Sequence, residues 1–243
     1  MFKDRRSIVL FDLDGTLRHS EPSALVTFHD FARDLGMAIS PEAERAALRW
    51  VHAYWADSPA LEEDEAASMD DREILWYRFT RRHLEALGAP EERLDEWAGL
   101  IHQRMSQEYQ PVDRVPDVVP GLLDSLAADG YRLGLVSNRR EPLTDLIREL
   151  RFDGRFEFVL AAGEVGWWKP DPRILRYALD QMQADPAEAV YVGDNYFADV
   201  PAALDAGLAA VLLDPENLFP EADCPVIRDL SELPGLLDGH SAQ

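Results

Sequence analysis

Three runs of apolar residues along the chain each end in small or acidic polar residues. They are SIVLFD, YRLGLVSN and AVYVGDN, which begin at Ser7, Tyr131 and Ala189. Because the hydrophobicity is continuous and does not alternate, both faces of each run must be covered, which is typical of buried parallel strands. We therefore predict three strands of a parallel sheet, each with polar residues at its carboxyl end.

Helix-period segments follow these runs and alternate with them. The segments are PGLLDSLAADG, EPLTDLIRELRF, DPRILRYALDQMQ and ADVPAALDAG, of which the first ends at Gly130 and the last at Gly207. A glycine after the last helical residue is the usual left-handed stop signal. The alternation predicts an α/β fold with a doubly wound, mostly parallel, Rossmann-like sheet, whose ligands bind outside the carboxyl ends of the strands.

The segment from Arg18 to Arg114 interrupts this alternation, because it offers no convincing strand and shows about four amphipathic helical stretches instead. Ser40 and Pro41 provide the N-cap and the first residue of one helix, and Gly88 ends another. The acidic stretch ADSPALEEDEAASMDD between these two helices has the composition of a solvated loop. We predict an α/β core of residues 1–17 and 115–243 with an inserted helical domain of residues 18–114.

Charge and cysteine content narrow the class of protein. Forty-six acidic against 24 basic residues give a net charge of −22, and 47% of the residues are hydrophobic, enough for a packed core. Because such a surface repels polyanions, we expect no nucleic-acid or anionic-membrane partner. Cys224 is the single cysteine, which excludes an intrachain disulfide and fits a reducing compartment. The apolar run after the basic N-terminus is too short for a signal peptide or a membrane span, so we expect a cytoplasmic protein.

Two acids directly follow the first predicted strand. In an extended segment residues i and i+2 point the same way, so Asp12 and Asp14 can share one site while Leu13 turns into the core. Neighbouring carboxylates repel unless a cation or a shared proton separates their roles, and such a pair can serve as nucleophile and acid. Gly15 permits a sharp turn after them, and the Thr16 hydroxyl can bond the turn backbone.

Four motifs in the order FDLDGT, LVSN, WWKPDP and VGDNYFAD resemble those of the haloacid dehalogenase (HAD) superfamily. The resemblance covers the whole chain, since the helical insertion between the first two motifs is similar to that superfamily's C1-type cap. It implies a Mg²⁺-dependent phosphatase that hydrolyses a small soluble phosphomonoester, in the phosphoglycolate phosphatase-like branch. Dehalogenase activity is disfavoured, because that subgroup lacks the second acid of the first motif, which is present here as Asp14.

The resemblance also implies roles for individual residues. Asp12 would attack the substrate phosphorus to form an aspartyl-phosphate, and Asp14 would protonate the leaving alkoxide and then activate water. Ser137 would bond a phosphoryl oxygen, cap the following helix, or do both. Asn138 would face the phosphoryl group or cap the turn, and Thr16 is a further candidate for substrate binding.

Lys169 is singled out by residue choice as well as by motif, because the chain has 22 arginines and only two lysines. A compact ammonium suits a crowded phosphate site better than the broad guanidinium fork does. An isolated surface lysine is the alternative interpretation. We expect Lys169 to offset the repulsion between the phosphoryl group and the attacking carboxylate.

Magnesium usually takes one or two protein carboxylates, and water and phosphate oxygens complete its shell. We expect carboxylates from Asp12, Asp194 and Asp199, and the resemblance adds the backbone carbonyl of Asp14. Asp199 could also reach the metal through water, orient Lys169, or simply favour the helix N-terminus where it stands. Two other functions stay open: a β-phosphoglucomutase-like phosphotransferase and a non-catalytic phosphate-binding module.

Overall fold

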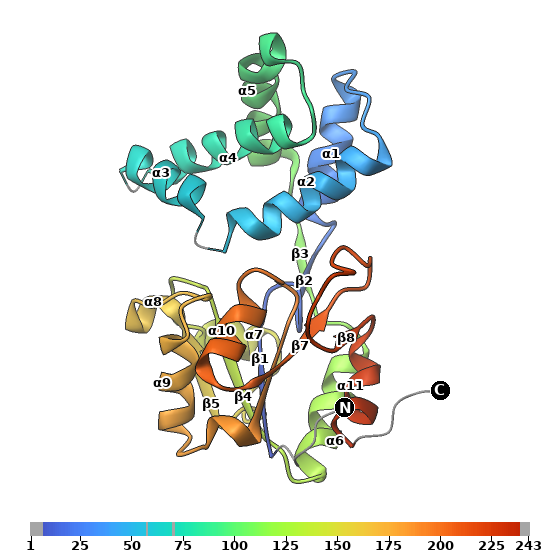
Figure 1. The fold of residues 1–243 in the computed structure, drawn as a ribbon. Coiled ribbons are helices and arrows are strands. Elements are labelled where there is room, and N and C mark those ends of the chain that lie inside the picture. Colours follow the sequence, from blue (N-terminus) through green and yellow to red (C-terminus); the bar gives the residue numbers. More distant parts are fainter. Residues whose placement is uncertain (1–6, 57, 70, 239–243) are drawn as a thin grey trace. The chain divides into compact units, whose positions relative to one another are not determined.

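The computed structural model describes residues 7–56, 58–69 and 71–238, and the chain divides into two compact units (Figure 1). The first unit consists of Met1–His19 and Val115–Gln243, and the second of Ser20–Arg114. The basic stretch 1–6, used above in the expectation about a signal peptide, lies outside the described residues. The chain thus leaves the first unit after His19 and returns to it at Val115.

A six-stranded sheet lies at the centre of the first unit. Its order is β5-β4-β1-β6-β7-β8, and each neighbouring pair is parallel. The strands are β1 (Ile8–Phe11), β4 (Arg132–Ser137), β5 (Phe158–Ala161), β6 (Ala189–Gly193), β7 (Ala209–Leu213) and β8 (Val226–Ile227). The predicted strands correspond to β4, β1 and β6, three neighbours in the sheet, and the predicted α/β fold class is confirmed.

Helices cover both faces of this sheet (Figure 1). In β1, Val9 and Phe11 belong to one core cluster with residues of α6, α7 and α11, whereas the equally buried Leu10 points to the opposite face. There, α9 contacts β4 and β5, and α10 contacts β6 and β7. The helices are α6 (Val118–Ala128), α7 (Thr144–Glu149), α8 (Ala162–Val165), α9 (Arg173–Gln181), α10 (Asp199–Ala206) and α11 (Leu233–Leu237), with short 3₁₀ turns at Pro186–Glu188 and Leu230–Glu232.

The second unit is a helical domain with a small sheet at its two chain ends. Its helices are α1 (Ala24–Asp34), α2 (Pro41–Tyr54), α3 (Pro59–Ser68), α4 (Arg72–Ala86) and α5 (Glu91–Glu108). The Ser40 hydroxyl accepts the N–H of Ala43 at 3.2 Å and Pro41 opens α2, as predicted. The expectation of no strand in this region is wrong, because β2 (His19–Glu21) pairs with β3 (Val112–Arg114). Strands of three residues are too short to leave a hydrophobic pattern.

The acidic stretch predicted as a loop contains helix α3. The Ser58 hydroxyl caps it by accepting the N–H of Leu61 at 3.1 Å. Asp64 is fully buried, and its carboxylate accepts hydrogen bonds from Tyr54, Arg78 and Arg82 at 2.7 to 3.1 Å. The loop prediction fails because arginines of the next helix, α4, neutralise an acid 14 and 18 residues before them that the local sequence presents as solvated.

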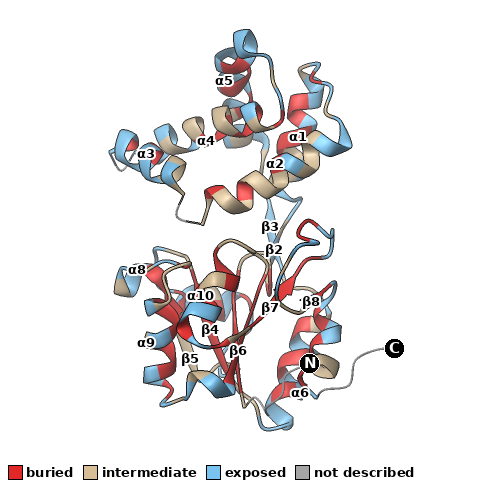
Figure 2. Ribbon diagram, viewed as in Figure 1, coloured by how far each residue is buried: buried red, intermediate tan, exposed pale blue. Residues whose placement is uncertain are grey.

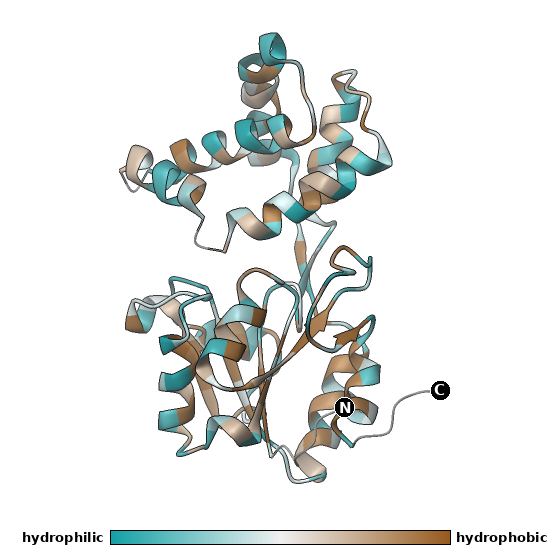
Figure 3. Cartoon of the chain, viewed as in Figure 1, coloured by the Kyte–Doolittle hydropathy of each residue, from teal (hydrophilic) through white to brown (hydrophobic). Residues whose placement is uncertain are grey.

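Buried positions and apolar residues coincide in both units (Figures 2 and 3). The strands of the first unit are buried along nearly their whole length, and the second unit has its own core cluster, formed mainly by residues of α1 and α5 with Leu84 of α4. The polar and charged side chains lie mostly on the outer faces of the helices. Among the residues described, no helix is both long enough and apolar enough to cross a membrane.

Candidate active site

The polar ends of three neighbouring strands meet at one edge of the sheet. Asp12 follows β1, Ser137 is the last residue of β4, and Asp194 follows β6. The strands are in register, since Phe11 pairs with Leu135 on one side and Val192 on the other. From β1 the sheet continues through β4 to β5 on one side and through β6 to β7 and β8 on the other, so the strand order reverses at β1. The carboxyl end of such a switch point is where doubly wound sheets bind ligands.

Lys169 is buried at this edge, and its ammonium contacts three oxygens. The Nζ atom lies 2.6 Å from Asp12 Oδ1, 2.7 Å from Asp199 Oδ1 and 2.6 Å from the Tyr191 hydroxyl. Only 2% of the residue is exposed, so it is not a surface lysine. An ammonium carries three N–H bonds, and here each has an acceptor. Although burial opposes its charge, the carboxylates of Asp12 and Asp199 raise the pKa of Lys169 well above its usual range.

The backbone of Lys169 is fixed as well. The Asn138 side chain accepts the N–H of Lys169 at 2.7 Å and donates to its carbonyl at 2.8 Å. The Tyr191 hydroxyl, which accepts from the ammonium, donates to the carbonyl of Val136 at 2.8 Å. Asn138 therefore joins the end of β4 to the loop that contains Lys169, which we call the lysine loop. Neither of the two roles expected for it, phosphoryl contact or a turn cap, describes these bonds.

Asp12 and Asp194 form a region of excess negative charge. Burial raises the pKa of Asp12 to about 7, against the opposing effect of Lys169. Burial, together with the charges of Asp12 and Asp199, raises the pKa of Asp194 well above its usual range. The fully buried Thr16 donates its hydroxyl to Asp194 Oδ1 at 3.3 Å, a carboxylate and not the turn backbone. This neutral hydroxyl does not balance the charge.

Gly15 allows the Asp194 carboxylate to come close to the FDLDGT motif. Gly15 has a φ of +91°, and a Cβ atom built on it would lie 2.3 Å from Oδ2 of Asp194. A side chain at this position would therefore both strain the backbone and displace the acid. In the same way, a Cβ atom on Gly193 would lie 2.2 Å from Oδ2 of Asp199. Both acids of the last motif are placed against backbone that carries no side chain.

Asp14 has different partners from Asp12. Arg139 binds it through two hydrogen bonds, from Nε to Oδ2 at 2.6 Å and from Nη2 to Oδ1 at 2.8 Å. Arg18 adds a contact from Nη1 to Oδ1 at 2.5 Å. Although burial works against the charged form, the two guanidinium groups lower the pKa of Asp14. The surroundings thus move the pKa values of Asp12 and Asp14 in opposite directions, as expected for carboxyl groups with separate tasks.

Asp199 is the first residue of α10, and both its carboxylate oxygens are bonded. Oδ1 accepts from Lys169, and Oδ2 accepts the backbone N–H of Asn195 at 2.8 Å. Of the alternatives open for this residue, the contacts correspond to orientation of Lys169 at a helix N-terminus. Within the described part of the chain, no three His, Cys, Asp or Glu side chains are arranged to hold a metal ion among themselves.

The remaining donor set suits Mg²⁺ nevertheless. This ion accepts one or two carboxylates and completes its shell with water and phosphate oxygens, so a cage of three side chains is not required. Asp12 and Asp194 offer hard oxygen ligands. Burial raises the pKa of each, and neighbouring carboxylates add to it: Asp199 acts on both, and the charge of Asp12 acts on Asp194. Lys169 is shared with Asp199, and Arg18 and Arg139 bind Asp14. A divalent cation beside Asp12 and Asp194 would balance the charge that these basic groups leave.

Three residues of the site escaped the sequence analysis: Arg18, Arg139 and Tyr191. Arg139 directly follows the LVSN motif, and Arg18 stands four residues after Asp14, so their positions offered a signal. The apolar pattern identifies Tyr191 only as a strand residue, although it is the one side chain of AVYVG with a polar end. By contrast, the prediction that Leu13 turns into the core is confirmed, since it is fully buried in the core cluster of the first unit.

Fold and site together define a hydrolase with a paired aspartate at the switch point of its sheet. The chain belongs to the haloacid dehalogenase-like hydrolase family, whose profile matches residues 7–207. This membership confirms the resemblance inferred from the four motifs.

Similar proteins include two phosphatases. The chain is 32% identical over 236 residues to phosphoserine phosphatase of Thermus thermophilus, covering 88% of this chain and 90% of that protein. It is 27% identical over 241 residues to phosphoglycolate phosphatase of Pseudomonas savastanoi, covering 95% and 80%. In fold it matches the HAD-hydrolase YfnB of Bacillus subtilis, solved with magnesium bound, with a TM-score of 0.57 and 20% identity, over 97% and 100% of the two chains. The family and the two phosphatases support the predicted enzyme class, a phosphoric monoester hydrolase.

Proposed function

We propose that this protein is a Mg²⁺-dependent phosphatase that hydrolyses a small phosphomonoester through an aspartyl-phosphate on Asp12. The observation that carries the proposal is the buried contact of Asp12 with Lys169. Asp14, two residues after Asp12, has basic partners of its own, two arginines. The relatives named phosphoserine and phosphoglycolate phosphatase support a small phosphorylated metabolite as the substrate. A reducing, cytoplasmic setting agrees with the single cysteine.

In the first half-reaction Asp12 attacks phosphorus. Its Oδ1 accepts from Lys169, so the attack falls to Oδ2. The ammonium lowers the repulsion between the carboxylate and the approaching phosphoryl group, because both are anionic. Lys169 can contact a phosphoryl oxygen itself only if one of its three present acceptors gives way. We therefore assign it first to charge compensation at Asp12, with direct substrate contact as a second role.

Asp14 transfers the protons of both half-reactions. Its ionised form, stabilised by Arg18 and Arg139, suits the second half, in which a carboxylate accepts a proton from the attacking water. Donation to the leaving alkoxide in the first half requires a protonated Asp14. An incoming phosphoryl group offers Arg139 another anion to bind, so this guanidinium can shift from Asp14 as the substrate arrives.

The other polar residues hold the phosphoryl group, the metal and the lysine loop. We assign the Ser137 hydroxyl to a phosphoryl oxygen, Asn138 to the backbone of Lys169, and Thr16 to Asp194. When bound, Mg²⁺ would neutralise the phosphoryl oxygens and fix their direction relative to Asp12. We propose the carboxylates of Asp12 and Asp194 and the carbonyl of Asp14 as its protein ligands. The family resemblance further assigns the helical insertion, residues 18–114, the role of a cap that selects the substrate.

The test is phosphate release from a panel of small phosphomonoesters, with phosphoserine, phosphoglycolate and a hexose monophosphate among them. With Mg²⁺ we expect release from at least one ester, and excess chelator should abolish it. Release that is indifferent to the chelator would contradict the metal requirement. An isomerised hexose phosphate without free phosphate would replace the phosphatase by a mutase, and no reaction with any ester would favour a non-catalytic binding module.

A further inference from the structure

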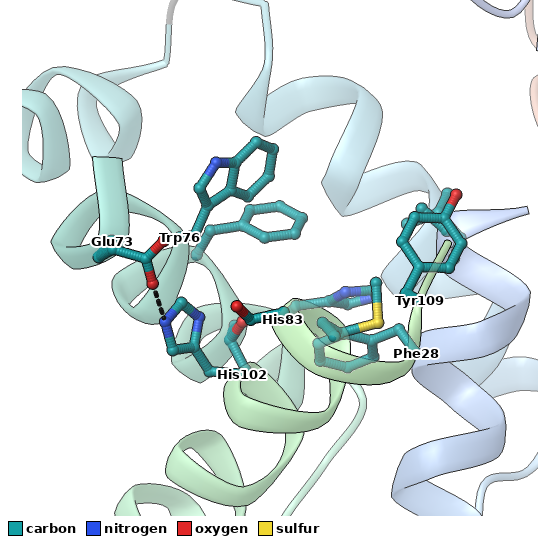
Figure 4. Close-up of a pocket in the computed structure, with 12 residues that line it drawn as sticks. Phe28, Glu73, Trp76, His83, His102 and Tyr109 are labelled. Carbon is teal, nitrogen blue, oxygen red and sulfur yellow. Dashed lines mark hydrogen bonds and ion pairs between the residues drawn. The ribbon is translucent and has the colours of Figure 1, made fainter. Parts of the chain in front are cut away.

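The second unit contains a pocket of its own, formed by three helices. Its volume is about 280 Å³, and twelve described residues of α1, α4, α5 and the chain just after α5 line it. The lining residues of α4 recur at helical spacing, from Glu73 through Trp76 and Thr80 to His83, so they share one face of that helix. Figure 4 shows the rings of Trp76, Phe28 and Tyr109 around this pocket. We call it the α1–α4–α5 pocket.

The walls of the pocket are held in place by ring packing. Phe28 stacks on His83 with 4.2 Å between the ring centroids, and Phe79 packs against Trp55 at 5.3 Å and against His83 at 5.6 Å. Trp76 packs edge-on against Phe79 at 5.8 Å. Because these lining rings pack against one another, and Phe79 also packs against Trp55 outside the lining, the cavity exists before any ligand arrives and binding need not order its walls.

The polar groups of the pocket favour a hydrogen-bond donor. None of the twelve described lining residues is Lys or Arg, so a phosphate or carboxylate group would find no cation there. At one side, His102 Nε2 lies 3.0 Å from Glu73 Oε2 (Figure 4). Facing a carboxylate, Nε2 is the donor of this bond, and in the tautomer with its single proton on Nε2 the Nδ1 atom is an acceptor. The hydroxyls of Thr80 and Ser106, also in the lining, can accept as well.

Size and chemistry together define the class of ligand. A cavity of roughly 150 Å³ with apolar walls holds one benzene molecule, so this pocket has room for about two fused rings. Aromatic walls favour a flat apolar body, and the acceptors favour a hydroxyl or N–H on it. We propose that the α1–α4–α5 pocket binds an uncharged ring compound of about this size that carries one hydroxyl or N–H donor. This site lies wholly within the second unit and does not depend on the proposed phosphatase activity.

Indole and 1-methylindole are a matched pair of probes. Both consist of two fused rings, but only indole has an N–H donor. Binding to the full chain is measured by isothermal titration calorimetry. We expect indole to bind about five- to tenfold more tightly than 1-methylindole, the effect of one hydrogen bond. Thr80→Val keeps the side-chain shape and should narrow this ratio, whereas Thr27→Val, a threonine of α1 outside the lining, should leave it unchanged.

A blocking variant locates the probe. Ser106 lines the pocket at an exposed position of α5, so Ser106→Phe fills the cavity without disturbing the core, and the adjacent exposed Gln107→Phe is its control. Loss of indole binding in Ser106→Phe alone supports the proposal. Equal affinity of the two probes, binding that survives Ser106→Phe, or no binding at all overturns it.

The natural ligand has two possible sources, an alcohol released from the substrate or a separate effector. Indole added to the phosphate-release assay separates them, and this arm alone rests on the proposed function. A raised KM with unchanged kcat means that indole and the substrate exclude one another, as expected where the natural ligand is the substrate's alcohol portion. A changed kcat with unchanged KM identifies a separate effector. Either effect must disappear in Ser106→Phe, and an effect that persists in this variant contradicts the assignment of the site.

Discussion

Asp12 and Asp14 stand two residues apart and yet meet opposite surroundings. Asp12 is buried beside Asp194 and Asp199 with one lysine, and burial raises its pKa to about 7. Arg139 and Arg18 lower the pKa of Asp14 despite its burial. The difference arises because Leu13 turns into the core and the loop then reverses at Gly15. At the scale of single residues, the site is therefore built to give two chemically identical groups different protonation behaviour.

Replacement of Asp194 by Asn tests the excess of negative charge. The pKa of Asp194 in the folded protein lies above its ordinary value of 3.8, so the folded state holds the proton more tightly than the unfolded state does. Metal-free wild type therefore loses stability as the pH rises above this ordinary value. We expect Asp194→Asn to raise the melting temperature of the metal-free protein, with a gain that grows as the pH rises above 3.8.

The same variant should also lose its response to magnesium. At 100 times its Kd, a ligand that binds only the folded state stabilises it by about 2.7 kcal/mol. We expect a gain of this order for wild type with Mg²⁺ and little gain for Asp194→Asn, measured by thermal unfolding with and without chelator. Asp205→Asn, at an exposed acid of α10, should behave like wild type. A full Mg²⁺ response in Asp194→Asn would remove Asp194 from the metal site.

Single residues of the site were predictable where residue choice itself carried the signal. Lys169 was identifiable because this chain otherwise uses arginine, and the four acids were identifiable because each follows a strand or opens a helix. The partners of these residues were not predictable. The bonds from Asn138 to Lys169 and from Arg139 to Asp14 join positions 31 and 125 residues apart, and only the folded chain brings them together.

At the scale of elements, the turn after β1 decides where Asp194 can lie. Gly15→Ala introduces a Cβ atom 2.3 Å from the Asp194 carboxylate, at a φ of +91°. Gly130→Ala is a matched control, because φ is +88° there and no atom lies within 4 Å of the added carbon. We expect both variants to lose roughly 1 kcal/mol of stability from backbone strain. Only Gly15→Ala should also lower kcat about a hundredfold, because the added Cβ atom displaces the Asp194 carboxylate.

Thermal unfolding and steady-state phosphate release with saturating Mg²⁺ give both quantities. Wild-type activity in both variants would mean that the close approach of Asp194 to Gly15 has no catalytic importance. A loss of activity in both variants would point to backbone strain and not to the displaced carboxylate.

The elements that the sequence predicted are helices with apolar residues on one face and strands whose residues are apolar on both faces. The neighbouring strands β4, β1 and β6 are buried on both faces, so their apolar runs were unambiguous. The pattern did not single out β5, β7 and β8, although β5 and β7 are as long as β1 and β6. Strand β8 has only two residues, too few to show a hydrophobic pattern, and apolar runs as short as β5 and β7 fit a buried helix equally well. Helix α3 was missed for another reason. Its buried Asp64 is stabilised by Arg78 and Arg82 of α4, and no local pattern reports such a contact.

At the scale of the whole molecule, the chain combines a net charge of −22 with a site proposed for an anionic substrate. The general field repels a phosphomonoester, so attraction has to be local. Lys169 and Arg139 lie at the carboxyl ends of the strands, and the excess charge of Asp12 and Asp194 leaves a place for a divalent cation. The negative overall charge thus explains why basic groups are concentrated at this site. The described lining of the α1–α4–α5 pocket, by contrast, contains no Lys or Arg.

The most direct test of the account is the turnover number of Asp12→Asn at saturating Mg²⁺ and substrate. Asparagine keeps the side-chain shape but is a far weaker nucleophile than the carboxylate, so we expect kcat to fall by at least about a thousandfold. Asp205→Asn, at an exposed acid of α10, is the control and should retain activity within a few-fold. Thermal unfolding should show that both variants are folded. A kcat close to that of wild type in Asp12→Asn would contradict the assignment of Asp12 as the nucleophile.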